Sequence, residues 1–315
     1  MRVVWLTKFG DPSVLVAGDA PDPVPDPGQV VIDVAFANIT FIETQFRATG
    51  AGPFKAEPPL IPGNGVGGVI SAVGPDTDTG LVGRRVVTSL NGTGGYASRV
   101  VVDATAPFEV PDGLALDDAV ALLADGRTAT MLIRAAALSP GERVLVEAAA
   151  GGVGSLAIQL AKAAGARVVA AAGGERKLAL ARELGADAAV DYRQPGWAAE
   201  AGALDVVLDG VGGSVAREAF ELLVPGGRML SYGLASGEWA TIAPEEAASR
   251  GVELIRPRPT PQELRSYVES ALATAAAGLL RPVIGQRFPL DRAADAHAAI
   301  ESRATVGKTL LEVKP

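Results

Sequence analysis

The sequence has no cysteine and only one histidine, His297, among its 315 residues. Disulfides, catalytic thiolates and thiolate metal sites are therefore excluded, and so are metal sites built from several histidines. No apolar run approaches the roughly 18 residues of a membrane span. The first residues also lack the basic segment, apolar run and cleavage site of a signal peptide. We therefore expect a cytoplasmic protein that has no membrane partner.

Aromatic residues make up only 5% of the chain, and the 28 Lys and Arg residues are outnumbered by 36 Asp and Glu. The formal net charge of -8 argues against a nucleic-acid partner, because phosphate contacts require a basic face. Apolar residues nevertheless reach 48%, which is enough for a core built mainly from Ala, Val and Leu. The length corresponds to about two domains.

The sequence changes its pattern near residue 115. Before that point, short β-rich runs alternate with Pro- and Gly-rich turns, which is typical of an antiparallel, barrel-like domain. After it, short apolar strands alternate with helical segments, which indicates a doubly wound parallel sheet with right-handed crossovers. The six strands expected in this sheet are 143–147, 167–170, 189–190, 205–208, 228–232 and 252–255.

A glycine-rich motif, Ala149–Gly154, follows the first of these strands and opens a helix. Aligned with G-x-G-x-x-G, it lets backbone N–H groups at Gly151 approach a pyrophosphate, while Gly154 allows the helix to pack close to the strand. The alternative is a tight turn that binds nothing. The strand before the motif, the helix after it and the further βα units favour dinucleotide binding.

The end of the second strand indicates which dinucleotide binds. NAD sites place an acidic residue there to hold the ribose 2′-hydroxyl, but residues 170–174 contain no acid. Arg176 and Lys177 follow, and Tyr192-Arg193 closes the third strand. Because a 2′-phosphate requires cations, this pattern predicts NADPH. The alternative is that Arg176 and Lys177 belong to an ordinary solvated helix face. Glu175 is the one acidic residue beside them, and its place near the helix N-terminus suits an interaction with the helix dipole.

Several motifs in order carry a family resemblance. The chain resembles the zinc-free, zeta-crystallin-like quinone oxidoreductases of the medium-chain dehydrogenase/reductase superfamily over essentially its whole length. Each motif is modest alone, but their order and spacing together are specific. The matching segments are 9–15, 62–69, 94–97, 148–154, 183–187, 205–213, 225–228 and 307–311.

The resemblance implies an α/β enzyme with two domains. A GroES-like, β-rich catalytic domain would span residues 1–118 and be completed by 259–315, around a Rossmann NADPH-binding domain at 119–258. It also implies a cleft in which NADPH meets a quinone or an α,β-unsaturated carbonyl compound. A homodimer is the expected assembly.

The resemblance further implies a set of coenzyme contacts. The 2′-phosphate would bind at Gly173, Lys177 and Tyr192, and the nicotinamide side at Thr128 and near Leu234 and Lys308. The turn expected to hold the pyrophosphate consists of Ala150, Gly151, Gly152 and Val153.

Metal and substrate positions depart from the patterns of relatives. Where zinc-dependent relatives carry a metal-binding His and Glu, this chain has Asn64 and Gly65, so no metal is expected. The substrate-pocket Asn and Asp of the family correspond to Thr40 and Glu43, and a frequent Tyr corresponds to Gln45. These departures leave the exact substrate open.

The expected chemistry is direct hydride transfer to a quinone or to the β-carbon of an enone. Charge developing on the carbonyl oxygen requires a donor, and Thr40, Gln45 and Arg47 are the substrate-pocket candidates, alongside Asn91 and Tyr96. Structural roles are an alternative for each of them, and the proton can come from solvent. His297 is expected to be a surface or capping residue without a catalytic role.

Two other functions remain open at this point. One is a biosynthetic enoyl reductase acting on a carrier- or CoA-bound acyl chain, with Arg47, Lys55 and Arg256–Arg258 near its entrance. The other is a sensor or structural protein that binds NADPH without turnover, which the departures at Thr40, Glu43 and Gln45 would suit.

Overall fold

The computed structural model describes residues 1–313, which form two compact units. The first unit contains residues 1–124 and the chain from Ala271 onward, and the second contains residues 125–270. The first is built on antiparallel strands and the second on a parallel sheet, as the sequence pattern predicts.

The borders between the units fall inside two helices, α2 (Leu116–Ala136) and α8 (Pro261–Ala276). The sequence placed these borders at 118 and 258, where its strand pattern changes, and residues 314 and 315 of its last segment lie outside the described residues. Neither helix was expected from the sequence. Although α2 has 21 residues, no helix in residues 1–313 is both long and apolar enough to cross a membrane.

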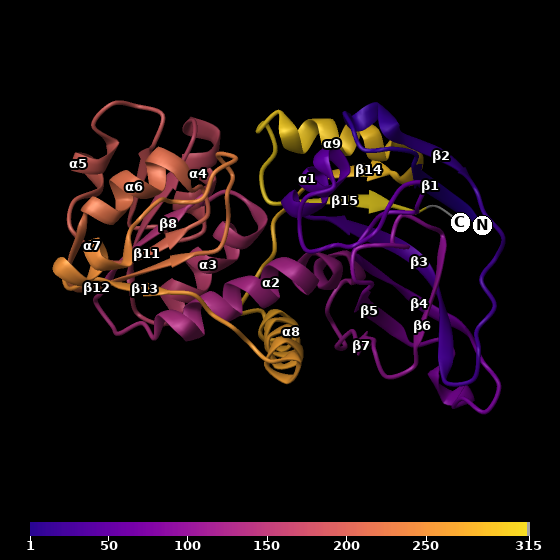
Figure 1. The fold of residues 1–315 in the computed structure, drawn as a ribbon. Helices are drawn as coiled ribbons and strands as arrows, with labels where there is room; N and C mark the ends of the chain where they lie inside the picture. Colours follow the sequence, from indigo (N-terminus) through magenta and orange to yellow (C-terminus); the bar gives the residue numbers. More distant parts are fainter. Residues whose placement is uncertain (314–315) are drawn as a thin grey trace. The chain divides into compact units, whose positions relative to one another are not determined.

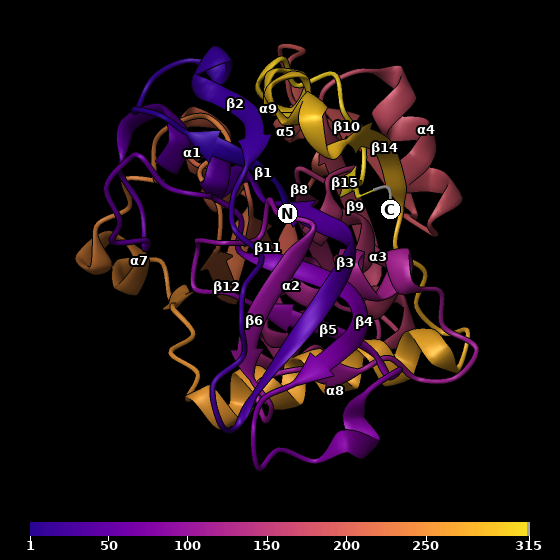
Figure 2. The same cartoon turned by 90° about the vertical axis from the view of Figure 1, so that its right-hand side faces the viewer.

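The sheet of the first unit is centred on β3, which pairs with three neighbours. Figure 2 shows β3, β4 and β5 side by side. Two register shifts against β4 bend this long strand, as bulges do in barrel-like sheets. All pairs are antiparallel except β14 with β15. The strands of this sheet are β3 (Gln29–Ile39), β4 (Gly65–Val73), β5 (Arg85–Ser89), β6 (Arg99–Asp103), β7 (Phe108–Glu109), β14 (Ile284–Pro289) and β15 (Lys308–Glu312). Strands β1 (Arg2–Leu6) and β2 (Leu15–Asp19) pair with each other in a separate two-stranded sheet.

Short helices complete the first unit. Helix α1 (Phe41–Thr49) follows β3 directly and ends at Gly50, whose φ of 73° is in the left-handed region that glycine adopts without strain. The sequence did not predict α1, whereas it predicted α9 (Ala293–Glu301) at the observed residues. Three 3₁₀ turns are also present: η1 (Pro12–Val14), η2 (Thr79–Leu81) and η3 (Leu290–Arg292).

Arg47 is buried inside the first unit, with 1% of its surface exposed. Its guanidinium donates to the carbonyl of Gly10 and to the carboxylate of Glu301, so it joins α1 to the end of α9. Burial lowers the pKa of Arg47, because the charged form is costly to desolvate. The placement of Arg47 in the substrate pocket is therefore corrected: in this structure it supports the packing of two helices.

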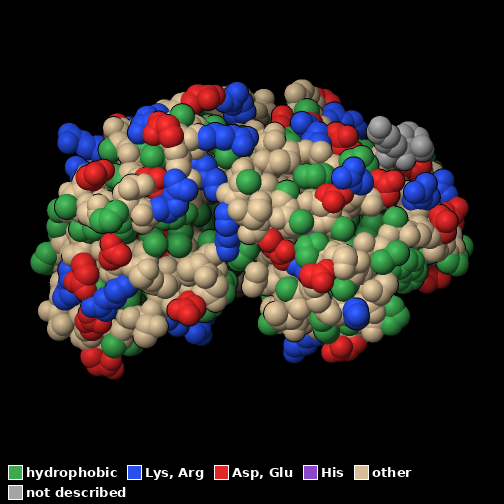
Figure 3. All heavy atoms as spheres, turned by 90° about the horizontal axis from the view of Figure 1, so that it is seen from above, with side chains coloured by type: hydrophobic (Ala, Val, Ile, Leu, Met, Phe, Trp, Pro, Cys, Tyr) green, Lys and Arg blue, Asp and Glu red, His purple; other side chains and the backbone are tan. Residues whose placement is uncertain are grey.

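Tyr96 and His297 form a second buried polar contact in the same unit. The Tyr96 hydroxyl and Nε2 of His297 share a hydrogen bond of 2.8 Å, and both residues are at most 1% exposed. No histidine appears on the face of the molecule drawn in Figure 3. The expected surface position of His297 is therefore wrong, because one face of α9 packs into the core.

The second unit contains six parallel strands in the order β10-β9-β8-β11-β12-β13. The order reverses between β8 and β11, which makes this the topological switch point where ligands bind in open α/β sheets. The strands are β8 (Arg143–Glu147), β9 (Arg167–Ala172), β10 (Ala188–Asp191), β11 (Leu204–Asp209), β12 (Leu223–Ser231) and β13 (Glu253–Ile255).

Helices pack on this sheet. One core cluster joins apolar residues of α5, α6 and α7 to the sheet, so these three helices cover the same face (Figure 1). Helices α3 and α4 form the crossovers from β8 to β9 and from β9 to β10. Their bounds are α3 (Gly152–Ala163), α4 (Glu175–Glu183), α5 (Trp197–Ala201), α6 (Gly213–Glu221) and α7 (Pro244–Ser249).

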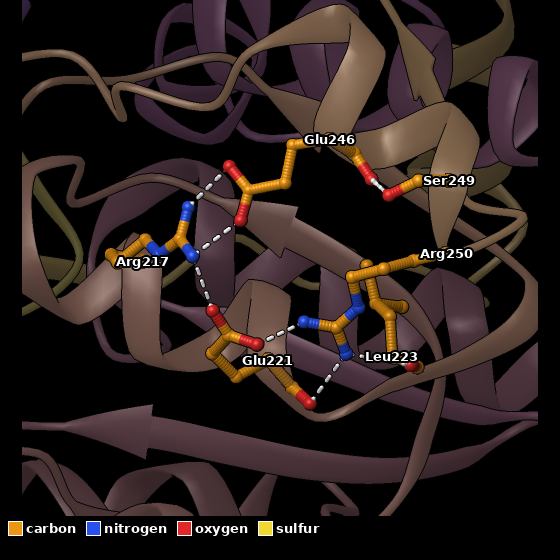
Figure 4. Close-up of polar contacts among 6 residues, drawn as sticks. All are labelled: Arg217, Glu221, Leu223, Glu246, Ser249 and Arg250. Atoms are coloured by element: carbon orange, nitrogen blue, oxygen red, sulfur yellow. Dashed lines mark hydrogen bonds and ion pairs between the residues drawn. The ribbon is translucent and has the colours of Figure 1, made fainter.

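An ion-pair network joins α6 to the segment around α7 (Figure 4). Arg217 donates to Glu246 and Glu221, and Arg250 donates to Glu221 and to the carbonyl of Leu223. The Arg250 guanidinium also lies 4.9 Å from the centre of the Phe220 ring. Solvent screens exposed ion pairs strongly, so the network supports the helix packing without dominating it.

The burial of His297 predicts a specific pH dependence of stability. Burial lowers the pKa of His297 from 6.5 in the unfolded chain to about 3 in the folded protein. The unfolding free energy is therefore highest above pH 6.5 and decreases as the pH falls toward 3. Between pH 7 and 5 the wild type should lose about 2 kcal/mol more unfolding free energy than His297→Gln. Urea unfolding at both pH values measures this difference. Equal losses in the two proteins would contradict the burial of a neutral imidazole.

Candidate dinucleotide-binding site

The turn between β8 and α3 is folded tightly enough to require glycine. The Gly151 N–H donates to the carbonyl of Ala148 at 2.8 Å, and Ala148 itself has a φ of 48°. A Cβ on Gly154 would lie 2.4 Å from that same carbonyl oxygen and 2.8 Å from Cα of Ala149. Residue 154 therefore has no room for a side chain, because backbone atoms surround it.

The first turn of α3 carries no side-chain cap. Its N-cap is Gly151, which has no polar side chain to accept from the leading N–H groups. Such groups, with the positive end of the helix dipole, form a ready binding site for phosphate oxygens. The turn predicted to hold a pyrophosphate, residues 150–153, thus has the backbone chemistry that this role requires.

Asp125 lies against this turn, which the sequence did not reveal. A Cβ on Gly152 would come within 1.9 Å of its Oδ2 atom, so a side chain at residue 152 would displace the Asp125 carboxylate. Asp125 belongs to α2, as do Arg127 and the half-buried Thr128. Burial lowers the pKa of Arg127, and the charge of Asp125 opposes that shift. Without a predicted α2, no signal in the sequence could place Asp125 here.

The turn between β9 and α4 contains no acidic side chain of its own. Gly173 and Gly174 form it, and Gly174 has a φ of 95°. Glu175 opens α4 but is drawn along the helix by an ion pair of 2.7 Å to Arg182. Lys177 belongs to the first turn of α4, and its N–H donates to the carbonyl of Gly174. The carboxyl end of β9 is therefore free of the acid that NAD sites usually carry there.

Two residues from the end of β10 reach this turn. Asp191 accepts from the Gly174 N–H at 3.0 Å and holds the Arg193 guanidinium by two hydrogen bonds of 3.0 and 2.7 Å. These contacts, mainly that of Arg193, lower the pKa of Asp191 to about 2, so it is charged at neutral pH. Tyr192 lies between them in the chain and is half-buried.

A pair of buried carboxyl groups lies at the switch point. Glu147 ends β8 and Asp209 ends β11, and both are fully buried. The N–H of Val211 lies 3.2 Å from one carboxyl and 3.1 Å from the other, while the Gly212 N–H donates to Asp209 at 2.7 Å. Burial, reinforced by the charge of Asp209, raises the pKa of Glu147 well above its usual range. The uncharged form of Glu147 is therefore favoured at this position.

This carboxyl pair was missed by the sequence analysis. Its signal is an acidic residue at the end of each of two apolar strands, which becomes a pair only when β8 and β11 are known to be neighbours. The pair holds the turn after β11, and that turn holds the loop after β12. Ala235 N–H donates to the carbonyl of Gly210 at 3.3 Å, and Ser236 N–H to that of Val211 at 2.8 Å.

Leu234 is half-buried in this loop, at the start of which Tyr232 donates to the carbonyl of Glu147. The β8–α3, β9–α4 and β11–α6 turns and the loop after β12 all follow carboxyl ends of parallel strands, so they share one edge of the sheet. The second unit therefore brings the predicted coenzyme residues that follow its strands to a single edge. Thr128 lies on α2, and Lys308 belongs to the first unit.

The predicted substrate residues belong to the first unit, around the start of α1. Thr40 donates its N–H and its hydroxyl to Oε2 of Glu43, at 2.7 and 2.6 Å. Its hydroxyl proton is thus already engaged, so Thr40 is not a free donor for a carbonyl oxygen. Gln45 is half-buried on the next turn, and within residues 1–313 the structure assigns its amide no hydrogen-bond partner.

Glu43 is the polar centre of this cluster. Its Oε1 atom accepts from the Asn64 N–H at 2.9 Å. Burial raises the pKa of Glu43, whereas the Thr40 hydrogen bonds and the charge of Lys308 oppose that rise. Lys308, predicted near the nicotinamide, is 3% exposed at the start of β15 in this unit.

The region does not fit a zinc ion. Asn64 uses its side-chain oxygen to accept from Gly92 at 2.8 Å, and Gly65 has no ligating atom in its side chain. Across residues 1–313, no group of three or more His, Cys, Asp or Glu side chains is arranged to hold a metal. A catalytic zinc normally takes three such ligands, so we derive no step through a metal.

Two protein-family models match the chain. The model described as "Alcohol dehydrogenase GroES-like domain" matches residues 26–112, which confirms the predicted class of the first unit. The model described as "Zinc-binding dehydrogenase" matches residues 184–311. The second description names a metal whose usual ligands the described residues do not supply.

The chain is similar to curated oxidoreductases over nearly its full length. It is 31% identical to the quinone oxidoreductase of Homo sapiens, covering 99% of this chain and 97% of that protein. It is also 31% identical to a 2-haloacrylate reductase of a Burkholderia species, with 96% of each covered.

Solved structures show the same similarity. The Escherichia coli quinone oxidoreductase complexed with NADPH has a TM-score of 0.89 and 28% identity, covering 99% of this chain and all of that one. A structure described as an NAD-dependent alcohol dehydrogenase has a TM-score of 0.90 and 31% identity, with full coverage of both chains. Both confirm the two-part α/β fold, and their descriptions name different coenzymes.

The glycine turn predicts opposite outcomes for two alanine substitutions. Gly154→Ala should lower the unfolding free energy by about 1–3 kcal/mol, because its Cβ meets backbone that cannot move aside. Gly151→Ala should change it by less than about 1 kcal/mol, because its φ is −80° and its nearest contact is 3.2 Å away. Denaturant unfolding of both variants measures this contrast. Similar losses in the two would show that the turn is packed differently.

Proposed function

Because the chain belongs to the quinone oxidoreductase branch of the medium-chain dehydrogenase/reductase superfamily, we propose that it uses NADPH to reduce quinones or α,β-unsaturated carbonyl compounds. The observation that carries the proposal is the carboxyl edge of the six-stranded sheet. At that edge, the β8–α3 turn has no side-chain cap. At the β9–α4 turn, the Arg193 guanidinium is exposed and the Asp191 carboxylate is paired with it.

The coenzyme contacts we propose are those that the sequence predicted. The pyrophosphate lies on the N–H groups of the β8–α3 turn, and the 2′-phosphate lies beside the β9–α4 turn. The residues assigned to coenzyme binding are Thr128, Ala150, Gly151, Gly152, Val153, Gly173, Lys177, Tyr192, Leu234 and Lys308. One similar structure is described as NAD-dependent, so the choice between NADPH and NADH needs a test. The missing acid at the end of β9 favours NADPH.

When bound, the coenzyme supplies a hydride from its nicotinamide ring. The chain itself binds, orients and shields the reactants. Gln45 is the side chain we assign to donate a hydrogen bond to the substrate oxygen, because Thr40 and Arg47 already spend their donors on Glu43, Gly10 and Glu301. The proton that completes the reduction comes from solvent, and no metal takes part.

We propose a homodimer as the working assembly. The edge strand β13 borders a small groove whose lining includes the apolar residues Met229, Ile242 and Leu254. Pairing of two such edges across a two-fold axis would cover this surface.

The function is tested by following NADPH oxidation with 1,4-benzoquinone, with an alkenone and with an enoyl-CoA. We expect turnover with the quinone or the alkenone, and we expect it to survive dialysis against a metal chelator, because the described residues offer no zinc ligands. The 2-haloacrylate reductase among the relatives makes the activated alkene a specific candidate substrate.

Other outcomes would contradict the proposal. Turnover with enoyl-CoA alone would favour the biosynthetic enoyl reductase. Tight NADPH binding without any turnover would favour a sensor. Activity lost to the chelator and restored by zinc would refute the metal-free mechanism.

A further inference from the structure

We propose that Arg193 and Asp191 together determine the selectivity for the 2′-phosphorylated coenzyme, Arg193 as its direct donor and Asp191 as the group that positions Arg193. The inference rests on the proposed use of NADPH and adds the element that produces the preference. It depends on the geometry of the β9–α4 turn and of the end of β10.

Asp191 holds Arg193 in one orientation. Oδ1 of Asp191 accepts from Nε and from the backbone N–H of Arg193, both at 3.0 Å, and Oδ2 accepts from a terminal guanidinium nitrogen at 2.7 Å. Such bidentate pairing fixes the guanidinium plane. It uses two of the five guanidinium N–H bonds, so three remain to donate to a ligand. The Arg193 side chain is 58% exposed, so those donors are accessible to solvent.

The glycines of the β9–α4 turn make room for this arginine. A Cβ on Gly173 would lie 3.0 Å from Cδ of Arg193, and a Cβ on Gly174 would lie 2.8 Å from its Nη2 atom. The guanidinium therefore lies over the backbone of the turn itself. This is the end of the second strand, the region in which dinucleotide-binding sheets distinguish the ribose 2′-substituent.

The opposite charges of Arg193 and Asp191 have opposite effects on the binding of a 2′-phosphate. The Asp191 carboxylate is 14% exposed and also accepts from the Gly174 N–H, so it lies at the same turn as the arginine. While Arg193 offsets this charge, its remaining guanidinium N–H groups are exposed and can donate to a phosphate. Without Arg193, the same turn would present a carboxylate, which repels a phosphate and accepts from a ribose hydroxyl. One substitution should therefore both weaken binding of the 2′-phosphate and favour the unphosphorylated ribose.

A purely structural role explains the pair less well. With Arg193 58% exposed, an ion pair between residues two apart in the chain contributes little to stability. Removing the Arg193 side chain should therefore leave the fold intact, which a thermal melt checks, and its effect on ligands can be measured directly.

The test compares the affinities of adenosine 2′,5′-bisphosphate and 5′-AMP by calorimetry, in the wild type and three variants. These ligands carry the distinguishing end of the coenzyme without its redox chemistry. Arg193→Ala should lose at least about tenfold in affinity for the bisphosphate and none for AMP. Adding Asp191→Asn to that variant should restore about threefold or more, because it removes the uncovered charge. Arg167→Ala, an exposed arginine at the opposite end of β9, is the matched control and should change neither affinity.

The outcomes separate this inference from the proposed function. If the wild type binds the bisphosphate no better than AMP, both are overturned. If the wild type prefers the bisphosphate and Arg193→Ala keeps the full preference, the inference fails while NADPH use stands. If the double variant recovers nothing, Asp191 has no part in the selection. Loss and partial recovery in the stated order support the inference.

Discussion

Neutralisation of acidic groups at the carboxyl edge of the parallel sheet is the constraint on which this account depends. Burial beside Asp209 raises the pKa of Glu147 well above its usual range, and Asp191 is paired with Arg193. The shift favours the uncharged form of Glu147, and the Arg193 guanidinium offsets the charge of Asp191. A polyanionic ligand can approach such an edge, because uncompensated carboxylates would repel it.

The same edge relies on close backbone packing. Gly154 has no space for a side chain, the Asp125 carboxylate lies against Gly152, and the Gly173–Gly174 turn lies under an arginine. In the first unit, by contrast, several polar side chains are buried in the core. Arg47 binds a carbonyl and Glu301 there, and Tyr96 binds His297, so most polar atoms that enter the core find partners. Arg47 and Tyr96, which the sequence analysis named as candidate donors to the substrate oxygen, therefore stabilise the core of this unit.

Much of the fold could be predicted from the sequence, since all six parallel strands are short apolar runs bounded by turn residues. Helix α9 was also predicted at its observed bounds. Helix α2 was not, because its Ala-rich residues are buried over most of their surface and show no clear periodicity. Because α2 was not predicted, the sequence placed the first border at 118, whereas in the structure it falls inside α2.

The candidate site was predictable where it consists of local turns. The glycine motif and the acid-free end of the second strand are read directly from consecutive residues. Contacts between distant segments could not be read. Tyr96 and His297 are 201 residues apart, and Glu147 meets Asp209 only because β8 and β11 are neighbours. Arg193 is close to Asp191 in sequence, yet its position over Gly173 depends on the shape of the turn.

The most direct test of the central claim is a phosphorus NMR titration of the 2′-phosphate in bound NADP⁺. Free in water, this group loses its second proton near pH 6 and becomes a dianion. A turn whose carboxylate, Asp191, is held by Arg193 leaves guanidinium N–H groups to stabilise the dianion, so the account predicts that its pKa in the complex falls below about 5. A bound phosphate that titrates at about pH 6 or higher would contradict the charge balance described for this edge.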